Sequence, residues 1–252
     1  MNAETGGFRD AHSVPPAAPP HRVRLPVNVH HWDNISFLHW PVAPDDIAPL
    51  LPTGLSPATY DGTSWIGVAS FFIRVRPLGV PIVPPRCAFP ETNLRTYVRG
   101  PDGGHGVWFI RMEVTALWFV LTLRALGLPY VQRRMSVDVH DDRIAYESGP
   151  RGGGFAGRHR IVVRPGAWLQ PREGGPFERF LTARWAAYHR QGPVLLATPV
   201  QHPPWSLRAG EVETCDVDAL FGAAGLPSPV GPPVCHVSPG VEVKVGPPCR
   251  VA

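Results

Sequence analysis

The sequence predicts a single, mainly β domain of the α+β class, built largely from antiparallel strands. The chain has 252 residues, which is close to the upper size of one domain. Its 32 prolines and 26 glycines are scattered along the chain, and this favours many short strands and tight turns over long helices. Turn signals between apolar segments predict hairpins, which are the usual connection of antiparallel strands.

Turn signals delimit the predicted strands. Pro101-Asp102-Gly103-Gly104 and Asp141-Asp142 each separate two strand-like segments, so each predicts a hairpin. Asp61-Gly62 predicts a turn before another strand. The strands expected on this basis are Ser64–Val75, Leu94–Arg99, Gly106–Val114, Met135–His140, Arg143–Glu147 and Phe155–Val163, with further strands within Gly231–Val251.

Three segments are predicted to be helices. Pro44–Leu51 has a proline near its start and two acidic residues in its first turn. Ala116–Leu126 ends at Gly127, with a proline beyond, which is a usual stop signal. Phe177–Arg190 carries large apolar residues at helical spacing.

The composition limits the cellular setting and the partners. Residues 1–24 are Pro-rich and predict a disordered leader, so the folded domain is expected to span residues 25–252. The net charge of +4 comes with no dense basic run, which argues against nucleic acid as a partner. The longest apolar stretch, Ala116–Leu123, is too short to cross a membrane. No cysteine lies in a CxxC pair and no signal peptide is present, so we expect reduced thiols and a cytoplasmic location.

The segment Glu91–Arg99 is the most informative for function. Side chains alternate between the two faces of a strand, so Glu91, Asn93, Arg95 and Tyr97 share one face. Two interpretations are open. The row faces water and Glu91 and Arg95 form a surface ion pair, or the row lines a cavity and binds a polar ligand, with Arg95 or Arg111 holding a carboxylate.

An ordered set of motifs resembles the YqjF-like family of uncharacterised bacterial proteins (DUF2071), a branch of the acetoacetate decarboxylase-like superfamily. The resemblance covers about residues 30–245. It implies curled antiparallel sheets that form a conical, barrel-like domain around a pocket, and it directs the polar face of the Glu91 strand into that pocket. The motifs are HWPV at 39–42, LPTGL at 51–55, DGTSWIGV at 61–68, FPETNLRTYV at 89–98, GVWF at 106–109, LPY at 128–130, YES at 146–148, FLTARW at 180–185, HPPW at 202–205 and HVS at 236–238.

One motif departs from the superfamily pattern. Acetoacetate decarboxylases form a Schiff base through a lysine in the motif Arg-Glu-x-x-Gly-aromatic-Pro-Lys-Lys. In the corresponding segment 124–131 of this chain, Tyr130 and Val131 stand in place of the two lysines. The only lysine of the chain is Lys244, far along the sequence. The amine chemistry is therefore expected to be absent.

The remaining chemistry is acid/base catalysis on a small keto or hydroxy acid, of lyase or isomerase type. The predicted catalytic residues are Glu91, Tyr130 and His202, and the predicted substrate-binding residues are Asn93, Arg95, Tyr97, Arg111 and Arg124. A non-catalytic metabolite-binding protein with the same pocket is the alternative, and a purely structural protein is a third hypothesis.

The expected partner is a small carboxylate. No cofactor is expected, and no metal, because HxH and HExxH spacings do not occur. The resemblance also suggests a homo-oligomer.

Overall fold

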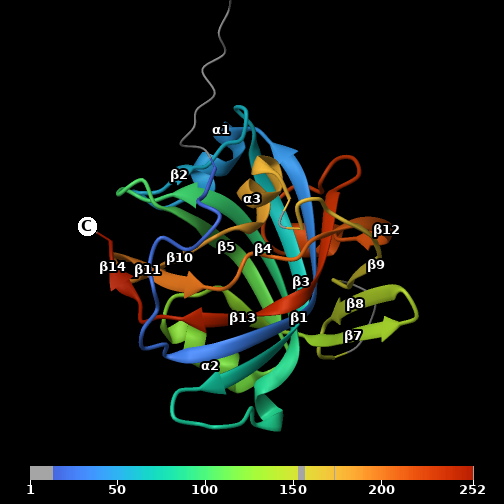
Figure 1. The fold of residues 1–252 in the computed structure, drawn as a ribbon, viewed down its shortest axis with the longest axis horizontal. Coiled ribbons are helices and arrows are strands. Elements are labelled where there is room, and N and C mark those ends of the chain that lie inside the picture. The colour runs from blue at the N-terminus through green and yellow to red at the C-terminus, as the bar shows by residue number, and fades with distance from the viewer. Residues whose placement is uncertain (1–13, 153–156, 173, 252) are drawn as a thin grey trace, which may run out of the picture.

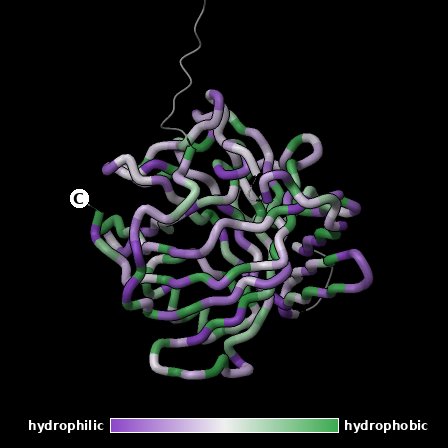
Figure 2. The backbone as a smooth tube through the Cα atoms, in the orientation of Figure 1, coloured by the Kyte–Doolittle hydropathy of each residue, from purple (hydrophilic) through white to green (hydrophobic). Residues whose placement is uncertain are grey.

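The fold is dominated by one large curled sheet (Figure 1). The computed structural model describes residues 14–152, 157–172 and 174–251. The strand order is β14-β11-β10-β5-β4-β3-β1-β13-β12-β9-β8-β7, with β2 beside β4 and β6 beside β5. Neighbouring strands are antiparallel, except that β5 pairs in parallel with both β10 and β6. Hydrophobic and hydrophilic residues are interleaved along the strands, as expected for half-buried sheets (Figure 2).

The elements have the following bounds. The strands are β1 (Asn28–Val42), β2 (Ser56–Pro57), β3 (Ser64–Pro77), β4 (Ala88–Arg99), β5 (His105–Val114), β6 (Tyr130–Gln132), β7 (Arg134–His140), β8 (Arg143–Gly149), β9 (His159–Trp168), β10 (Ala186–Gln191), β11 (Val194–Gln201), β12 (Arg208–Asp216), β13 (Val234–Val245) and β14 (Cys249–Arg250). The helices are α1 (Pro44–Ile47), α2 (Leu117–Ala125), α3 (Pro176–Thr182) and α4 (Asp218–Gly222), with 3₁₀ turns η1 (Ala48–Leu50) and η2 (Pro85–Cys87).

The sheet closes on itself through a short pairing of β11 with β13. Val200 and Gln201 of β11 lie opposite Val245 and Lys244 of β13. The pairings therefore run in a closed circuit from β11 through β10, β5, β4, β3, β1 and β13 back to β11. The seams at β5–β10 and β11–β13 are short, so this ring of strands is a curled sheet rather than a regular barrel.

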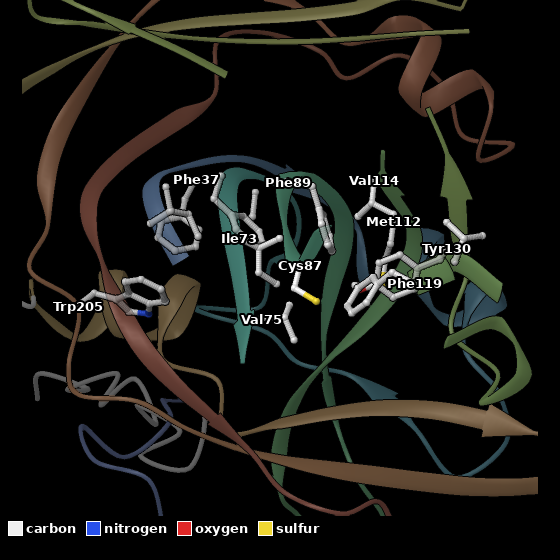
Figure 3. Packing of buried hydrophobic residues seen from close by; sticks show 14 of the residues in the cluster. Phe37, Ile73, Val75, Cys87, Phe89, Met112, Val114, Phe119, Tyr130 and Trp205 are labelled. Carbon is white, nitrogen blue, oxygen red and sulfur yellow. The ribbon is translucent and has the colours of Figure 1, made fainter. Parts of the chain in front are cut away.

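The two faces of the ring carry separate hydrophobic clusters. The inner cluster includes Phe37, Phe71 and Met112, and it packs against Phe119 and Trp205 (Figure 3). The outer cluster, Leu38, Trp40, Val68 and Leu94 with Tyr146, Ile161 and Val163, is covered by β8 and β9. The extension β12-β9-β8-β7 thus protects the outside of the ring, and the inside is left to form a site.

A β-bulge on β5 changes which side chains face the interior. Arg111 lies opposite Leu94 and Phe109 lies opposite Arg95, so Ile110 has no direct partner on β4. The extra residue reverses the alternation along β5. As a result Phe109 and Met112 both face the interior, and Arg111 faces outwards.

Most predicted elements are confirmed. The hairpins β4–β5 and β7–β8, strand β3, the C-terminal strands and helices α1 and α2 all occur where turn signals predicted them. The prediction for Phe155–Val163 begins in residues that are not described, and the strand there is β9. In the described portion, no helix has the length and apolar composition needed to cross a bilayer.

The helix predicted over Phe177–Arg190 is wrong beyond residue 182. α3 ends at Thr182, Ala183 is extended, and β10 follows from Ala186. β10 pairs with β11 along its whole length and with β5 on its other edge. These long-range pairings override the local helical spacing, since propensity is a weak prior against tertiary context.

The predicted leader is partly placed against the domain. Residues 1–13 lie outside the described residues. From residue 14 the chain packs on the ring: the indole of Trp185 donates to the carbonyl of Pro16, the amide of Val23 donates to Gln201, and Val23 is buried. The segment 14–24 therefore contacts the folded domain.

Gly127 provides a test of how α2 is seated. Its φ is +85°, and a Cβ there would overlap the carbonyl oxygen of Arg190 in β10. We expect Gly127→Ala to lower the free energy of unfolding by about 3 kcal/mol or more, measured by urea denaturation. The control is Gly62→Ala, which has a φ of +79° but open space around the position, and should cost about 1–2 kcal/mol. Equal decreases in the free energy of unfolding for the two variants would contradict the close contact between Gly127 and β10.

Candidate functional site

A cavity of about 190 Å³ occupies the inside of the ring of strands. Side chains from β1, β3, β4, β5, β10 and β11 line it, and α2 together with the segment 245–248 borders it. Most of the lining is aliphatic or aromatic, including Ile73, Met112, Phe119 and Trp205 (Figure 3). An apolar hollow with a few polar groups is the usual form of a small-molecule site.

The inward face of β4 supplies part of the polar lining. Glu91, Asn93 and Arg95 all face the cavity, as the alternation of the strand predicted. Glu91 is 3% exposed and Arg95 is 7% exposed. Both side chains are buried and no ion pair joins them in the described structure, so of the two interpretations the surface ion pair is wrong. The hypothesis of a purely structural protein requires this row of side chains to face water. The row is buried, which contradicts that hypothesis.

Glu91 is bonded to Tyr130 and keeps one oxygen open. The hydroxyl of Tyr130 donates to Oε1 of Glu91 at 3.2 Å. Oε2 of Glu91 has no hydrogen-bond partner among the described residues. Burial raises the pKa of Glu91 to about 7, and the bonds from Asn93 and Tyr130 oppose that shift. Burial raises the pKa of Tyr130 well above its usual value, so this phenol keeps its proton.

Arg95 is held by aromatic rings. Its guanidinium carbon lies 5.3 Å from the ring centre of Phe37 and 5.8 Å from that of Tyr97. Its Nε has no hydrogen-bond partner in the described ranges. Ring faces stabilise the cation only modestly, so Arg95 retains the capacity to bind an anion.

Arg184 is a second buried cation at the cavity, and sequence reasoning did not assign it a role. Its guanidinium carbon lies 4.4 Å from the ring centre of Tyr97, and Nη2 donates to the carbonyl of Phe180. Burial lowers the pKa of Arg184 to about 9, which leaves it protonated at neutral pH. The signal that pointed to it was the motif FLTARW. The predicted helix obscured its position, because the chain turns from α3 into β10 here.

His202 lines the cavity as a neutral ring. It lies between two indoles, with ring centres 4.7 Å from Trp185 and 4.8 Å from Trp205. Nδ1 is 2.7 Å from the carbonyl oxygen of Pro203, an arrangement in which the ring N–H donates. Burial lowers the pKa of His202 to about 4. His30 also lines the cavity, and burial and His31 lower its pKa to about 4 as well.

Tyr97 lies behind the cavity wall. Its hydroxyl is 2.5 Å from Nε2 of His39, and both side chains are buried. Its ring supports Arg95 and Arg184. The structure therefore places Tyr97 beside the two arginines rather than on the cavity surface.

Arg111 and Arg124 are not brought to the cavity. Both border a separate shallow hollow beside β6. Arg111 lies outside the ring because of the bulge on β5, and its Nε donates to Glu113 at 2.8 Å. Arg124 lies on the exposed side of α2. Their predicted role in holding a substrate in this cavity has no geometric support.

Lys244 and two residues of the family motifs, His236 and Ser148, also lie outside the cavity. Lys244 does not line the cavity, because Val245 faces it and neighbouring strand residues point to opposite sides. His236 and Ser148 do not line it either. In the described parts of the chain, no cluster of three His, Cys, Asp or Glu side chains has metal-binding geometry.

Comparison with known sequences finds a family and a relative. The model of the DUF2071 family, described as an uncharacterized conserved protein, matches residues 29–242. The uncharacterized protein YqjF of Bacillus subtilis (strain 168) is 30% identical over 218 residues, which cover 86% of this chain and 89% of YqjF.

Solved structures share the fold. An acetoacetate decarboxylase-like enzyme from Sphingomonas wittichii RW1 aligns with a TM-score of 0.61 at 14% identity, covering 92% of this chain and 95% of that one. The enduracididine biosynthesis enzyme MppR, complexed with pyruvate, aligns with a TM-score of 0.65 at 16% identity, covering 90% and 91%. These structures confirm the acetoacetate decarboxylase-like fold.

The raised pKa of Glu91 predicts how stability depends on pH. The folded protein holds this proton up to about pH 7, whereas an unfolded chain releases it near 4.5. The native state binds more protons between these values, so this group's contribution to stability is lost as pH rises from 4.5 to 7. Glu91→Gln has no such proton to lose. Its free energy of unfolding, relative to that of the unsubstituted protein, should therefore rise by about 3 kcal/mol from pH 4.5 to pH 8, measured by urea unfolding at both pH values. A difference that does not change with pH would contradict the burial of an ionisable Glu91.

Proposed function

Because the chain belongs to the DUF2071, YqjF-like family and has the acetoacetate decarboxylase-like fold, we propose that its cavity binds a small keto or hydroxy acid and that Glu91 moves a proton on it. The reaction class is that of a lyase or isomerase that uses acid/base groups. The observation that carries the proposal is the pair of buried arginines, Arg95 and Arg184, without an acidic partner in the described residues.

The charge of the cavity favours a carboxylate ligand. Arg95 and Arg184 are cations, and Glu91 is neutral below about pH 7 because burial raises its pKa. A buried charge without a counter-charge is costly, and a ligand carboxylate supplies that counter-charge through paired N–H donors. The pyruvate complex of MppR supports the same ligand class for this fold.

The chemistry differs from Schiff-base catalysis. No lysine lines the cavity, and Tyr130 occupies the position that the superfamily motif gives to a lysine. A phenol with a raised pKa donates a hydrogen bond and does not attack a carbonyl. Glu91 then acts as the base: its open Oε2 removes a proton from the carbon beside the ligand carbonyl and later returns it, and the arginines stabilise the enolate between the two steps.

The same cavity also suits a non-catalytic metabolite-binding protein. This alternative is favoured by the lack of a lining lysine, because the nucleophile of the related decarboxylases has no counterpart at the cavity. Both functions require carboxylate binding, and only the enzyme requires proton transfer. The two are therefore separated by a binding assay and an exchange assay.

Carboxylate binding tests the arginines. Pyruvate should raise the melting temperature of the protein, and Arg95→Met should weaken pyruvate binding by roughly 10–100-fold, since one charge-assisted hydrogen-bonding group is lost. Arg124→Met is the matched control, because Arg124 is exposed and lies outside the cavity; it should bind as the unsubstituted protein does. Equal effects of the two substitutions on pyruvate binding would contradict the proposal that Arg95 binds the carboxylate.

Proton transfer tests Glu91. In heavy water, the protein should exchange the C3 protons of a bound 2-oxo acid for deuterium, followed by proton NMR. The rate should rise with pH and level off above about 7, where Glu91 is ionised. Glu91→Gln should slow the exchange by about 10²–10⁴-fold. Tight binding with no exchange in either protein would instead support the metabolite-binding function. Borohydride should trap no covalent adduct with the keto acid.

A further inference from the structure

The polar and apolar parts of the cavity lining are unevenly distributed between its interior and its mouth. Glu91, Arg95, Arg184, Tyr130 and His202 are all buried. The most exposed lining residues, in contrast, are apolar: Val27 is 42% exposed, Leu126 is 37% exposed, and Pro248 is exposed as well. The charged end of the cavity is therefore its inner end, and the opening is apolar.

An apolar wall joins these two ends. The ring of Tyr130, which contacts Glu91, lies 5.2 Å from the ring of Phe119 on α2 (Figure 3). From Phe119 the wall continues through Leu123 to Leu126 at the mouth. Apolar residues of β11 and β13, among them Val200 and Val245, line the cavity as well.

Two polar residues along this wall, His189 and Thr198, are satisfied by the protein itself. His189 binds the carbonyl of Leu126 through Nδ1 at 2.8 Å, and its Nε2 is 3.1 Å from the hydroxyl of Thr198. Asn28 is half-buried near the mouth, and its Oδ1 has no hydrogen-bond partner among the described residues, so it offers a ligand one polar contact there. The wall therefore offers a ligand mainly apolar contact between the arginines and the solvent.

We propose that the acid bound in this cavity carries an extended apolar chain, which runs from the arginines along Phe119 and Leu123 to the mouth at Leu126. This inference rests on the proposed function and specifies its substrate class. A three- or four-carbon acid occupies only the polar end and leaves the apolar wall in contact with water. An acid with an aliphatic or aryl chain removes that wall from water, which strengthens binding in proportion to the buried area.

The test is a series of straight-chain carboxylates, from acetate to decanoate, and the matching 2-oxo acids, titrated into the full chain by isothermal calorimetry. Each added methylene should tighten binding about fourfold until the chain reaches the mouth, and the gain should then level off. The heat capacity change should become more negative with chain length. Affinity that does not depend on chain length would overturn the inference.

Two substitutions on the same stretch locate the chain. Leu126→Gln should weaken octanoate binding at least threefold and leave acetate binding unchanged. Leu121→Gln is the matched control, because Leu121 lies on α2, is 62% exposed and does not line the cavity; it should change neither. Both positions are exposed, so both variants should fold. Equal effects of the two would overturn the path proposed for the chain.

The outcomes separate this inference from the proposed function. If all acids bind with the same affinity and Arg95→Met abolishes their binding, the proposed carboxylate site is supported and the inference of an extended apolar chain is wrong. If decanol binds as tightly as decanoate and Arg95→Met has no effect, the cavity is an apolar pocket and the proposed function fails. If no acid of any length binds, both fail.

Discussion

The enclosure of two guanidinium groups and a carboxyl group inside a closed circuit of strands is the constraint on which the rest of the structure depends. Burial is unfavourable for each charged group. Aromatic ring faces partly offset this cost for Arg95, and a hydrogen bond from the Tyr130 hydroxyl does so for Glu91. The short β11–β13 seam completes the enclosure. The raised pKa of Glu91 follows directly from this burial.

The local parts of the fold could be predicted from the sequence, because turn chemistry acts over a few residues. The hairpins β4–β5 and β7–β8 and the end of α2 at Gly127 are of this kind. The segment after Thr182 could not, because β10 exists through pairings with β5 and β11 that no local pattern encodes. That one error also hid Arg184, which the turn out of α3 directs towards the cavity.

The same distinction explains which site residues were found. Strict alternation along β4 correctly placed Glu91, Asn93 and Arg95 on one face. Arg111 was expected to bind substrate, but one bulged residue on β5 reverses the later side chains and turns Arg111 outwards. The inward direction of the β4 face came from the family resemblance, since a polar row by itself fits a solvent-facing surface equally well.

The electrostatics of Glu91 indicate where a ligand would lie. Nearby guanidinium groups normally lower the pKa of a carboxyl group. The pKa of Glu91 is nevertheless raised, and the groups that oppose this shift are Asn93 and Tyr130, with no arginine among them. Glu91 and Arg95 are also four residues apart along β4, which separates their backbones by roughly 13 Å. In the proposed function, this separation lets the arginines hold the ligand carboxylate while Glu91 moves a proton on a neighbouring carbon, without an amine.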